Sequence, residues 1–344
     1  MTYNAREYSA EEGAPVLLVT FALGDKVWRF ARADQDLQHG GEVYTAPPGG
    51  IEPTRLRDSS ETRKNEVTLT VDRSFPIAEL WRVAPPTAIV GARLVQIHQD
   101  EPEDAVAWLG HVSNVSWIGE ARAEITLSPG AMAMKSNGLR RLWQRSCSHV
   151  LYGPKCRLSR WGAPTEAVVT EVDGSVITAP ELAGAPGLAS GRLSWIGAGG
   201  VPRAALILSH AGDTITLGPG HQPLQVDDQV LAAPAAHQVA GELQDVEGLW
   251  LQSPAFDNGM KFNGGFLEWT DSEGVTDWRA ITAHAGDRIQ VMTHAPRLAA
   301  GMIVVAVEGC ARTIERCAEL GNTDNFGGIP YFMTKNPFGG DPIY

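Results

Sequence analysis

From its start to Gly130, the chain alternates between short apolar stretches and turn residues. We predict strands at Val16–Phe21, at Lys26–Ala31 behind the Gly24–Asp25 turn, and at Glu42–Tyr44 behind Gly40–Gly41. Their short length and close spacing are typical of an all-β domain.

Two later stretches show the period of two that marks a half-buried strand. In NEVTLTV the apolar residues fall on one face and the threonines on the other, and a second stretch alternates in the same way; the apolar sets are Val67, Leu69 and Val71, and Ala123, Ile125 and Leu127. Half-buried antiparallel strands of this kind predict a β-sandwich or barrel.

The pattern changes at SNGLRRLWQRSC, where Leu139, Leu142 and Trp143 recur at helical spacing behind Asn137, a residue suited to cap a helix. We therefore predict a short helix over 137–146. The surrounding stretch from 125 to 164 contains no acidic residue, and its basic residues are Lys135, Arg140, Arg141, Arg145, Lys155, Arg157 and Arg160.

The remainder of the chain contains an internal repeat with a constant offset, in which position i matches position i + 74. Leu193 and Trp195 match Leu267 and Trp269, and the tetrapeptide HAGD occurs at 210 and again at 284. The offset holds over about 60 positions, which excludes chance similarity and predicts two similar β modules.

The histidines of the two HAGD segments, His210 and His284, resemble a pair of metal ligands or catalytic groups. Each occupies the same place in a repeated turn, however, and the two belong to different modules. We therefore expect both side chains to shape their turns.

Composition supports an ordered, turn-rich chain, with 37 Gly, 22 Pro, 43% hydrophobic and 20% charged residues. The net charge of −12 argues against a sequence-independent coat for DNA or RNA. No apolar run approaches the roughly 18 residues of a membrane-spanning helix, and the N-terminal stretch lacks the features of a secretory signal. We expect that the chain does not insert into a membrane and that it folds in a reducing cytoplasm.

The expected fold is mainly β: an N-terminal β-sandwich or barrel, a short helix, and two repeated small β modules. The predicted domains are an N-terminal β domain over 1–130, a helix with the first cysteine loop over 131–161, a first module over 162–237, a second module over 238–311, and the end of the second cysteine pair with an extended tail over 312–344.

Four cysteines form two close pairs, Cys147 with Cys156 and Cys310 with Cys317, about 150 residues apart. Two local disulfides would need an oxidising compartment, which the N-terminus gives no reason to expect. A zinc site usually has two to four residues between paired cysteines, whereas these pairs have eight and six. An iron–sulfur cluster accepts wider loops, and the basic stretch around the first pair would offset its negative charge. Four inert buried thiols are the remaining alternative.

The segments CSHVLYGPKC and GCARTIERCAELGNTDNFGGIPYF resemble the tail-tip and baseplate hub proteins of long-tailed phages, a family that includes the tail-tip protein of phage lambda and the hub of gene transfer agents. The resemblance covers most of the chain, and its most specific parts are the paired cysteines and Asn325–Gly328.

The resemblance implies a [4Fe-4S] cluster held by Cys147, Cys156, Cys310 and Cys317, with zinc as the alternative. It also implies an N-terminal domain related to tail-tube folds and a homotrimer in the virion tail, assembled in the host cytoplasm. The implied partners are the distal tail protein, the central fibre or receptor-binding tip protein and the tape measure protein, with DNA passing through unbound.

The cluster would then staple two distant segments together rather than act as a reaction centre, and we expect no enzyme activity. Trp143 and Tyr152 flank the first pair, where they would either shield a cluster from water or pack in the helix. Two other functions stay open: a redox protein that uses the cluster for electron transfer, and a cell-wall-binding or hydrolytic tail module.

Overall fold

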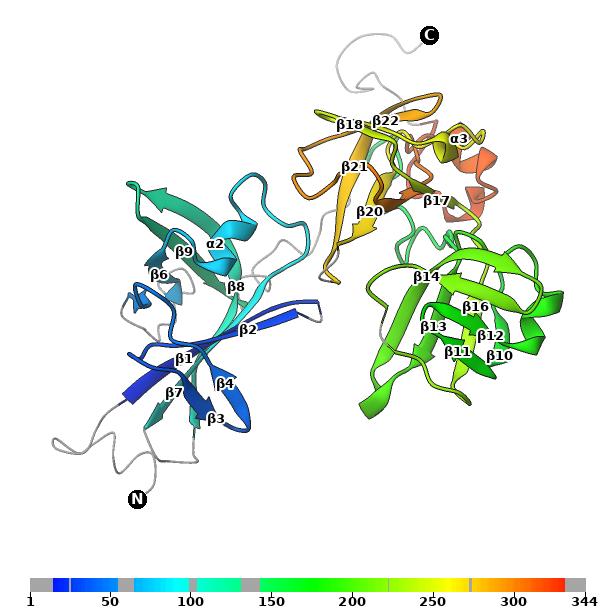
Figure 1. Cartoon of the computed structure of the whole chain (residues 1–344). Helices are drawn as coiled ribbons and strands as arrows, with labels where there is room; N and C mark the ends of the chain where they lie inside the picture. The colour runs from blue at the N-terminus through cyan, green and yellow to red at the C-terminus, as the bar shows by residue number, and fades with distance from the viewer. Residues whose placement is uncertain are drawn as a thin grey trace, which may run out of the picture. The chain divides into compact units, whose positions relative to one another are not determined.

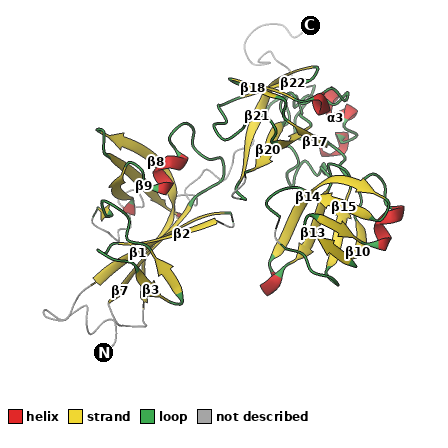
Figure 2. Cartoon of the chain, viewed as in Figure 1, coloured by secondary structure: helices red, strands yellow, loops and turns green. Residues whose placement is uncertain are grey.

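The computed structural model of the chain describes residues 15–24, 26–54, 65–98, 104–130, 143–221, 223–271 and 274–331. The chain divides into two compact units, Met1–Gly138 and Leu139–Tyr344. Both consist mainly of β-strands with a few short helices (Figures 1 and 2), which confirms the predicted class. None of the described helices is long and apolar enough to span a membrane.

The N-terminal unit is built on one antiparallel sheet of seven strands in the order β2-β1-β7-β8-β9-β6-β5, and β3 and β4 form a separate hairpin. The elements are β1 Pro15–Leu23, β2 Lys26–Ala31, β3 Leu37–His39, β4 Glu42–Tyr44, β5 Glu52–Pro53, β6 Val67–Asp72, α2 Pro76–Leu80, β7 Gly91–His98, β8 Asp104–Ile118 and β9 Arg122–Pro129.

Alternation along the strands builds the core of this unit as predicted. In the β6–β9 pair, Val67, Leu69 and Val71 lie opposite Leu127, Ile125 and Ala123, and all six are buried. Bulges interrupt the register where β8 pairs with β7 and with β9. Since a bulge increases local bend and twist, they help this single sheet to curl.

The second unit contains the same seven-stranded arrangement twice, in the orders β10-β16-β13-β14-β15-β12-β11 and β17-β23-β20-β21-β22-β19-β18. The first module contains β10 Thr165–Val168, β11 Glu171–Asp173, β12 Val176–Thr178, η3 Pro180–Gly184, β13 Arg192–Ile196, η4 Ala198–Gly200, β14 Pro202–Ala211, β15 Thr214–Leu217 and β16 Gln229–Ala233.

The second module contains β17 Gln238–Glu242, β18 Asp245–Glu247, β19 Trp250–Gln252, η5 Pro254–Phe256, β20 Phe266–Thr270, β21 Thr276–Ala285, β22 Arg288–Val291 and β23 Ile303–Val307. Each strand from β11 to β16 has a counterpart among β18 to β23 that starts one repeat offset later in the chain. For example, β13 starts at Arg192 and β20 starts at Phe266. The sequence repeat is therefore a repeat of strand order and register.

Each module closes through a bent first strand. Only two residues separate β10 from β11, yet these strands lie at opposite edges of the sheet order. At the bend, Val169 N donates to Asp228 O and Thr170 N donates to Thr178 O. The second module makes both bonds at the equivalent positions of the repeat, from Leu243 and Gln244. Each sheet therefore curls around its own apolar core.

The two HAGD histidines make equivalent hydrogen bonds. His210 Nε2 lies 3.1 Å from Leu182 O and 2.9 Å from Gly212 O, and His284 Nε2 lies 3.1 Å from Phe256 O and 2.8 Å from Gly286 O. In both modules the imidazole ties the turn to the preceding short helix. The geometry agrees with a structural role for both.

The two modules are joined by polar contacts between Ser190 and the start of β17. Ser190 O accepts from Gln238 Nε2 at 2.5 Å, and Ser190 Oγ accepts from Ala240 N at 2.8 Å. Gln238 is buried, and its Oε1 accepts from Arg160 Nε at 2.9 Å. The residues before the first module thus take part in the contact between modules.

The prediction of a helix over 137–146 is wrong for its described part. Residues 137–142 lie outside the described residues, and Trp143–Ser146 are not helical. The backbone in this stretch pairs with the C-terminal region instead, since Gln144 O accepts from Ile329 N at 2.9 Å. This long-range partner replaces the local hydrogen bonds of a helix.

Candidate metal centre

The first cysteine pair lies in an irregular loop that is fixed by backbone hydrogen bonds. Cys147 N donates to Arg312 O at 2.8 Å, and Gly153 N donates to Val150 O at 3.0 Å. Tyr152 adopts a positive φ of 58°, and its hydroxyl donates to Glu308 O at 2.8 Å. The loop therefore contacts the second cysteine segment at two points.

The second pair follows the last strand of the second module. Thr313 caps the helix α3 (Ile314–Glu319) by accepting from Arg316 N, and Cys317 lies on this helix. Cys310 precedes the cap and packs closely against Gly264, where an added Cβ would lie 3.0 Å from Cys310 O. Gly264 also has a φ of +77°, so that glycine suits this position on both grounds.

All four cysteines line one cavity of about 50 Å³. Its wall contains Cys147, His149, Leu151, Cys156, Leu158, Gly264, Cys310, Arg312, Cys317, Leu320, Asn322, Asn325 and Phe326. The four thiols are free, so the structure contains neither of the two local disulfides considered above. The structure thus brings together the four residues that the sequence singled out.

Three of the four sulfurs accept hydrogen bonds from nitrogen donors. Gly327 N donates to Cys147 Sγ at 3.2 Å, Arg312 N donates to Cys310 Sγ at 3.3 Å, and Asn322 Nδ2 donates to Cys156 Sγ at 3.4 Å. Donors of this kind stabilise charge on sulfur, and they surround thiolates that bind metal.

The thiols also influence one another electrostatically. Burial raises the pKa of the Cys317 thiol, and the neighbouring Cys310, Cys147 and Cys156 raise it further. Nevertheless, no group of three or more His, Cys, Asp or Glu side chains within the described ranges is arranged to hold one metal ion. The four sulfurs surround a cavity instead of converging on one point.

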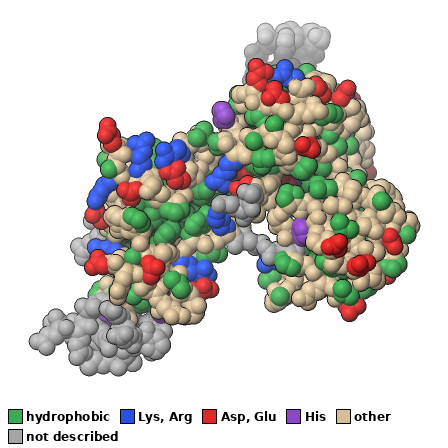
Figure 3. All heavy atoms as spheres, in the orientation of Figure 1, with side chains coloured by type: hydrophobic (Ala, Val, Ile, Leu, Met, Phe, Trp, Pro, Cys, Tyr) green, Lys and Arg blue, Asp and Glu red, His purple; other side chains and the backbone are tan. Residues whose placement is uncertain are grey.

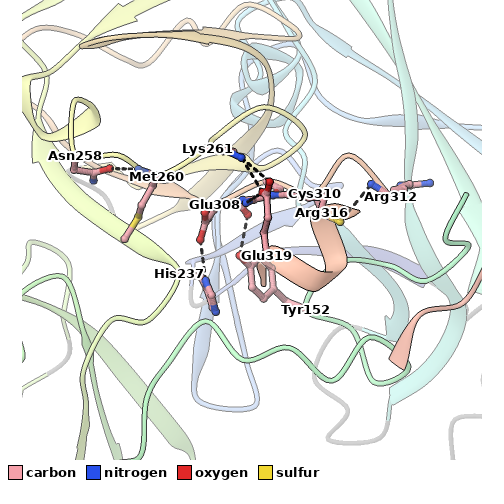
Figure 4. Close-up of polar contacts among 11 residues, drawn as sticks. Tyr152, His237, Asn258, Met260, Lys261, Glu308, Cys310, Arg312, Arg316 and Glu319 are labelled. Carbon is pink, nitrogen blue, oxygen red and sulfur yellow. Dashed lines mark hydrogen bonds and ion pairs between the residues drawn. The ribbon is translucent and has the colours of Figure 1, made fainter. Parts of the chain in front are cut away.

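A partly buried ionic network supports the second cysteine segment (Figure 4). The Arg316 guanidinium contacts Glu308 Oε1 at 2.7 Å and Glu319 Oε2 at 2.8 Å, and it donates to Gly309 O. Glu308 also lies 2.8 Å from His237 Nδ1. Burial raises the pKa of Glu308, but hydrogen bonds from Arg316 and His237 lower it by more, so its pKa lies below the ordinary value.

The segment Asn325–Gly328 lies against the first cysteine loop, although it follows the second pair in sequence. His149 Nδ1 lies 3.0 Å from Asn325 O, and Ser148 Oγ donates to Gly327 O. An added Cβ on Gly327 would lie 2.5 Å from His149 Nε2, so this close approach requires glycine. The segment therefore joins the two cysteine regions.

One expectation about the surroundings of the first pair is wrong. Trp143 does not shield the site, since it is 79% exposed and lies outside the cavity wall, which Leu151 and Phe326 help to form. The arginine of that wall is Arg312, from the second cysteine segment. Arg160, from the acid-free stretch, pairs with Glu268 instead.

Sequence reasoning missed Arg316, Glu308 and Asn322. Arg316 lies inside CARTIERC between the two cysteines, and it is only 8% exposed. The only available signal was a charged residue on the same helix as a candidate ligand. For Glu308, the signal was its position directly after the apolar strand β23 (Ile303–Val307).

Two family models match parts of the chain. Residues 13–159 match the family described as "Baseplate hub protein, N-terminal attachment domain", and residues 260–336 match the family described as "Phage conserved hypothetical protein BR0599". The first match contains Cys147 and Cys156, and the second contains Cys310 and Cys317.

Similar proteins were also found by sequence and by structure. An "Uncharacterized protein" of Xylella fastidiosa (strain 9a5c) is 24% identical over 169 residues, which are 46% of this chain and only 35% of that relative. A chain from "Virion of native gene transfer agent (GTA) particle" has 16% identity and a TM-score of 0.48, covering 99% of this chain and 96% of its own. The family matches support a structural protein of the phage tail.

Proposed function

We propose that the chain is a hub protein of the phage tail tip or baseplate, and that it is structural and not an enzyme. In this role it forms a homotrimeric ring that joins the distal tail protein to the central fibre or receptor-binding apparatus. The name of the family that matches residues 13–159 supports this proposal, because that family is an attachment domain of baseplate hubs. The tape measure protein is the expected partner above the ring.

We further propose that Cys147, Cys156, Cys310 and Cys317 hold a [4Fe-4S] cluster. The observation that supports this most is that four free thiols from two distant segments line one cavity. The donor set fits such a group, since a cluster takes one thiolate on each iron, and nitrogen donors already face three of the sulfurs. When bound, the cluster supplies covalent cross-links between the segments.

The chain's own residues make this cross-link structural. Tyr152 and Arg312 already tie the first cysteine loop to the second segment through hydrogen bonds. Closing a loop of about 150 residues removes conformational entropy from the unfolded chain, which by analogy with disulfides is worth about 4–5 kcal/mol. The cluster would thereby fix the end of the second module to the region that precedes the first.

An acidic surface agrees with a channel through which DNA passes without sticking. Between residues 162 and 260 the only Lys or Arg side chains are Arg192 and Arg203. Acidic side chains are visible on the first module in Figure 3.

The function is tested by replacing cysteines in the genome that produces the particles. We expect Cys147→Ser and Cys310→Ser each to prevent the assembly of complete tails, seen by electron microscopy. The matched control is Val150→Ser, in the same loop but 73% exposed and outside the cavity wall. Purified tails should contain the chain in a multiple of three copies. Infectious particles that carry both cysteine substitutions would contradict the proposed cross-linking role of the cluster. Complete tails that lack the chain would contradict the proposed role as a hub protein.

A further inference from the structure

We propose that Asn322 is a positioning residue of the four-cysteine site, and that its side-chain amide tunes the Cys156 sulfur. This inference rests on the proposed cluster. Asn322 lies outside both cysteine pairs and carries no charge, so nothing in the motif spacing points to it. Its contacts reach one cysteine from each pair.

The helix end places Asn322 at the site. Helix α3 is followed by Gly321, which has a φ of +64°. Gly321 N donates to Ala318 O, and Asn322 N donates to Cys317 O at 2.9 Å. These two bonds form the Schellman arrangement, in which a glycine at the helix end turns the chain back over the last helical turn. Asn322 is therefore held directly beside Cys317.

The side-chain amide reaches the other cysteine pair. Asn322 Nδ2 donates to Cys156 O at 2.7 Å and lies 3.4 Å from Cys156 Sγ. On the second pair, the Cys317 thiol lies 3.1 Å from Asn322 O. One residue thus contacts a prospective ligand from each segment.

A third residue fixes which end of the amide faces Cys156. Asn325 Nδ2 donates to Asn322 Oδ1 at 2.8 Å. If the amide were flipped, its oxygen would face the Cys156 carbonyl and its nitrogen would face another donor. The hydrogen-bond partners on both sides therefore require the nitrogen to point at Cys156.

A nitrogen donor on a ligating sulfur lowers the electron density that the sulfur passes to iron. Removing it makes the cluster harder to reduce, because hydrogen bonds to the sulfurs set part of the reduction potential. The isosteric change Asn322→Asp keeps the acceptor for Asn325 but replaces the donor with a negative oxygen. Because Asp and Asn have nearly the same size, an effect of this substitution reports the loss of the donor and not a change in packing.

The test uses the full chain, prepared without oxygen, as parent, N322D and N322A. The control is N258D, which makes the same charge change at an exposed turn of the same unit that contributes nothing to the cavity wall. We measure the reduction potential and the rate at which a chelator removes iron. In both N322D and N322A the reduction potential should fall by at least about 59 mV. For a one-electron couple, that lowers the ratio of reduced to oxidised cluster at a fixed potential tenfold. Folded N322D that no longer retains iron also supports the role.

N325A provides a second test if either Asn322 variant fails to fold. It removes one of the two partners that orient the Asn322 amide, so it should shift the potential in the same direction by less. N322D with the parent's potential and iron-loss rate would overturn the role of Asn322 while leaving the cluster intact. A parent chain without iron and sulfide would instead overturn the proposed cluster and this inference with it.

Discussion

Replacing Arg316 with Met removes the centre of the network that supports the second cysteine segment. Arg316 is 10% exposed in its side chain and its partner Glu308 is 13% exposed. Met keeps an unbranched apolar stem in place of the arginine stem, but it leaves Glu308 with His237 as its remaining side-chain partner among those described. The change therefore leaves the Glu308 carboxylate in a buried position without its arginine partner.

Breaking a buried ion pair by removing one partner costs about 3–5 kcal/mol. The second partner, Glu319, is 47% exposed, so solvent screens its ion pair and the loss of that pair adds little. His237 still contacts Glu308 and compensates for part of the loss, which leaves an expected destabilisation of about 3–4 kcal/mol. For a unit of this size, that lowers the melting temperature by about 10 °C.

The effect should also depend on pH. The pKa of Glu308 lies below its ordinary value of 4.5, so its stabilisation is present above that pH and is lost as the pH falls through the lowered pKa. The difference between parent and Arg316→Met should therefore be largest near neutral pH and shrink in acid.

The assay is calorimetry of the full chain, as purified and after removal of metal by a chelator. Lys261→Met is the matched control, because Lys261 contacts the same Glu319 but is 63% exposed (Figure 4). We expect this control to lower the melting temperature far less than Arg316→Met does, because both of its partners are exposed to solvent. If Arg316→Met shifts the melting temperature by no more than Lys261→Met does, the buried Arg316–Glu308 pair does not stabilise the chain as we expect.

Further predictions concern close packing and the repeat. Gly327→Ala should destabilise the chain by about 1–3 kcal/mol, because the added Cβ collides with His149, whereas Gly184→Ala meets no atom within 4 Å and should be neutral; equal melting temperatures would contradict this. His210→Ala and His284→Ala should each cost about 1–3 kcal/mol in thermal denaturation, since each leaves two carbonyls without their imidazole. A large loss for one histidine and none for the other would refute their equivalence.

Much of the fold could be predicted because its determinants are local. The period-two pattern of Val67, Leu69 and Val71 directly reflects one buried face of β6. The repeat was visible because one strand arrangement, with its Gly–Asp turn, is encoded twice at a fixed offset. The helix over 137–146 failed within its described part because Gln144 and Arg145 have partners near residue 330, which no local pattern reveals.

The cysteines of the candidate site could be predicted from the sequence, but the residues that support them could not. Four cysteines in two pairs are conspicuous in any sequence, and the structure places all four at one cavity. The roles of Arg316 and Asn322 depend on burial and on contacts between segments far apart in sequence. An arginine or asparagine in a short motif looks the same whether it faces solvent or a thiol, so the sequence alone could not single them out.

The central claim is tested most directly by measuring iron and acid-labile sulfide in the full chain, purified without oxygen. We expect about four irons and four sulfides per chain, with a brown colour and a broad absorbance near about 400 nm. Cys147→Ser should lower both contents, and Val150→Ser should not. A colourless chain that contains one zinc, or four titratable thiols and no metal, would contradict the proposed [4Fe-4S] cluster.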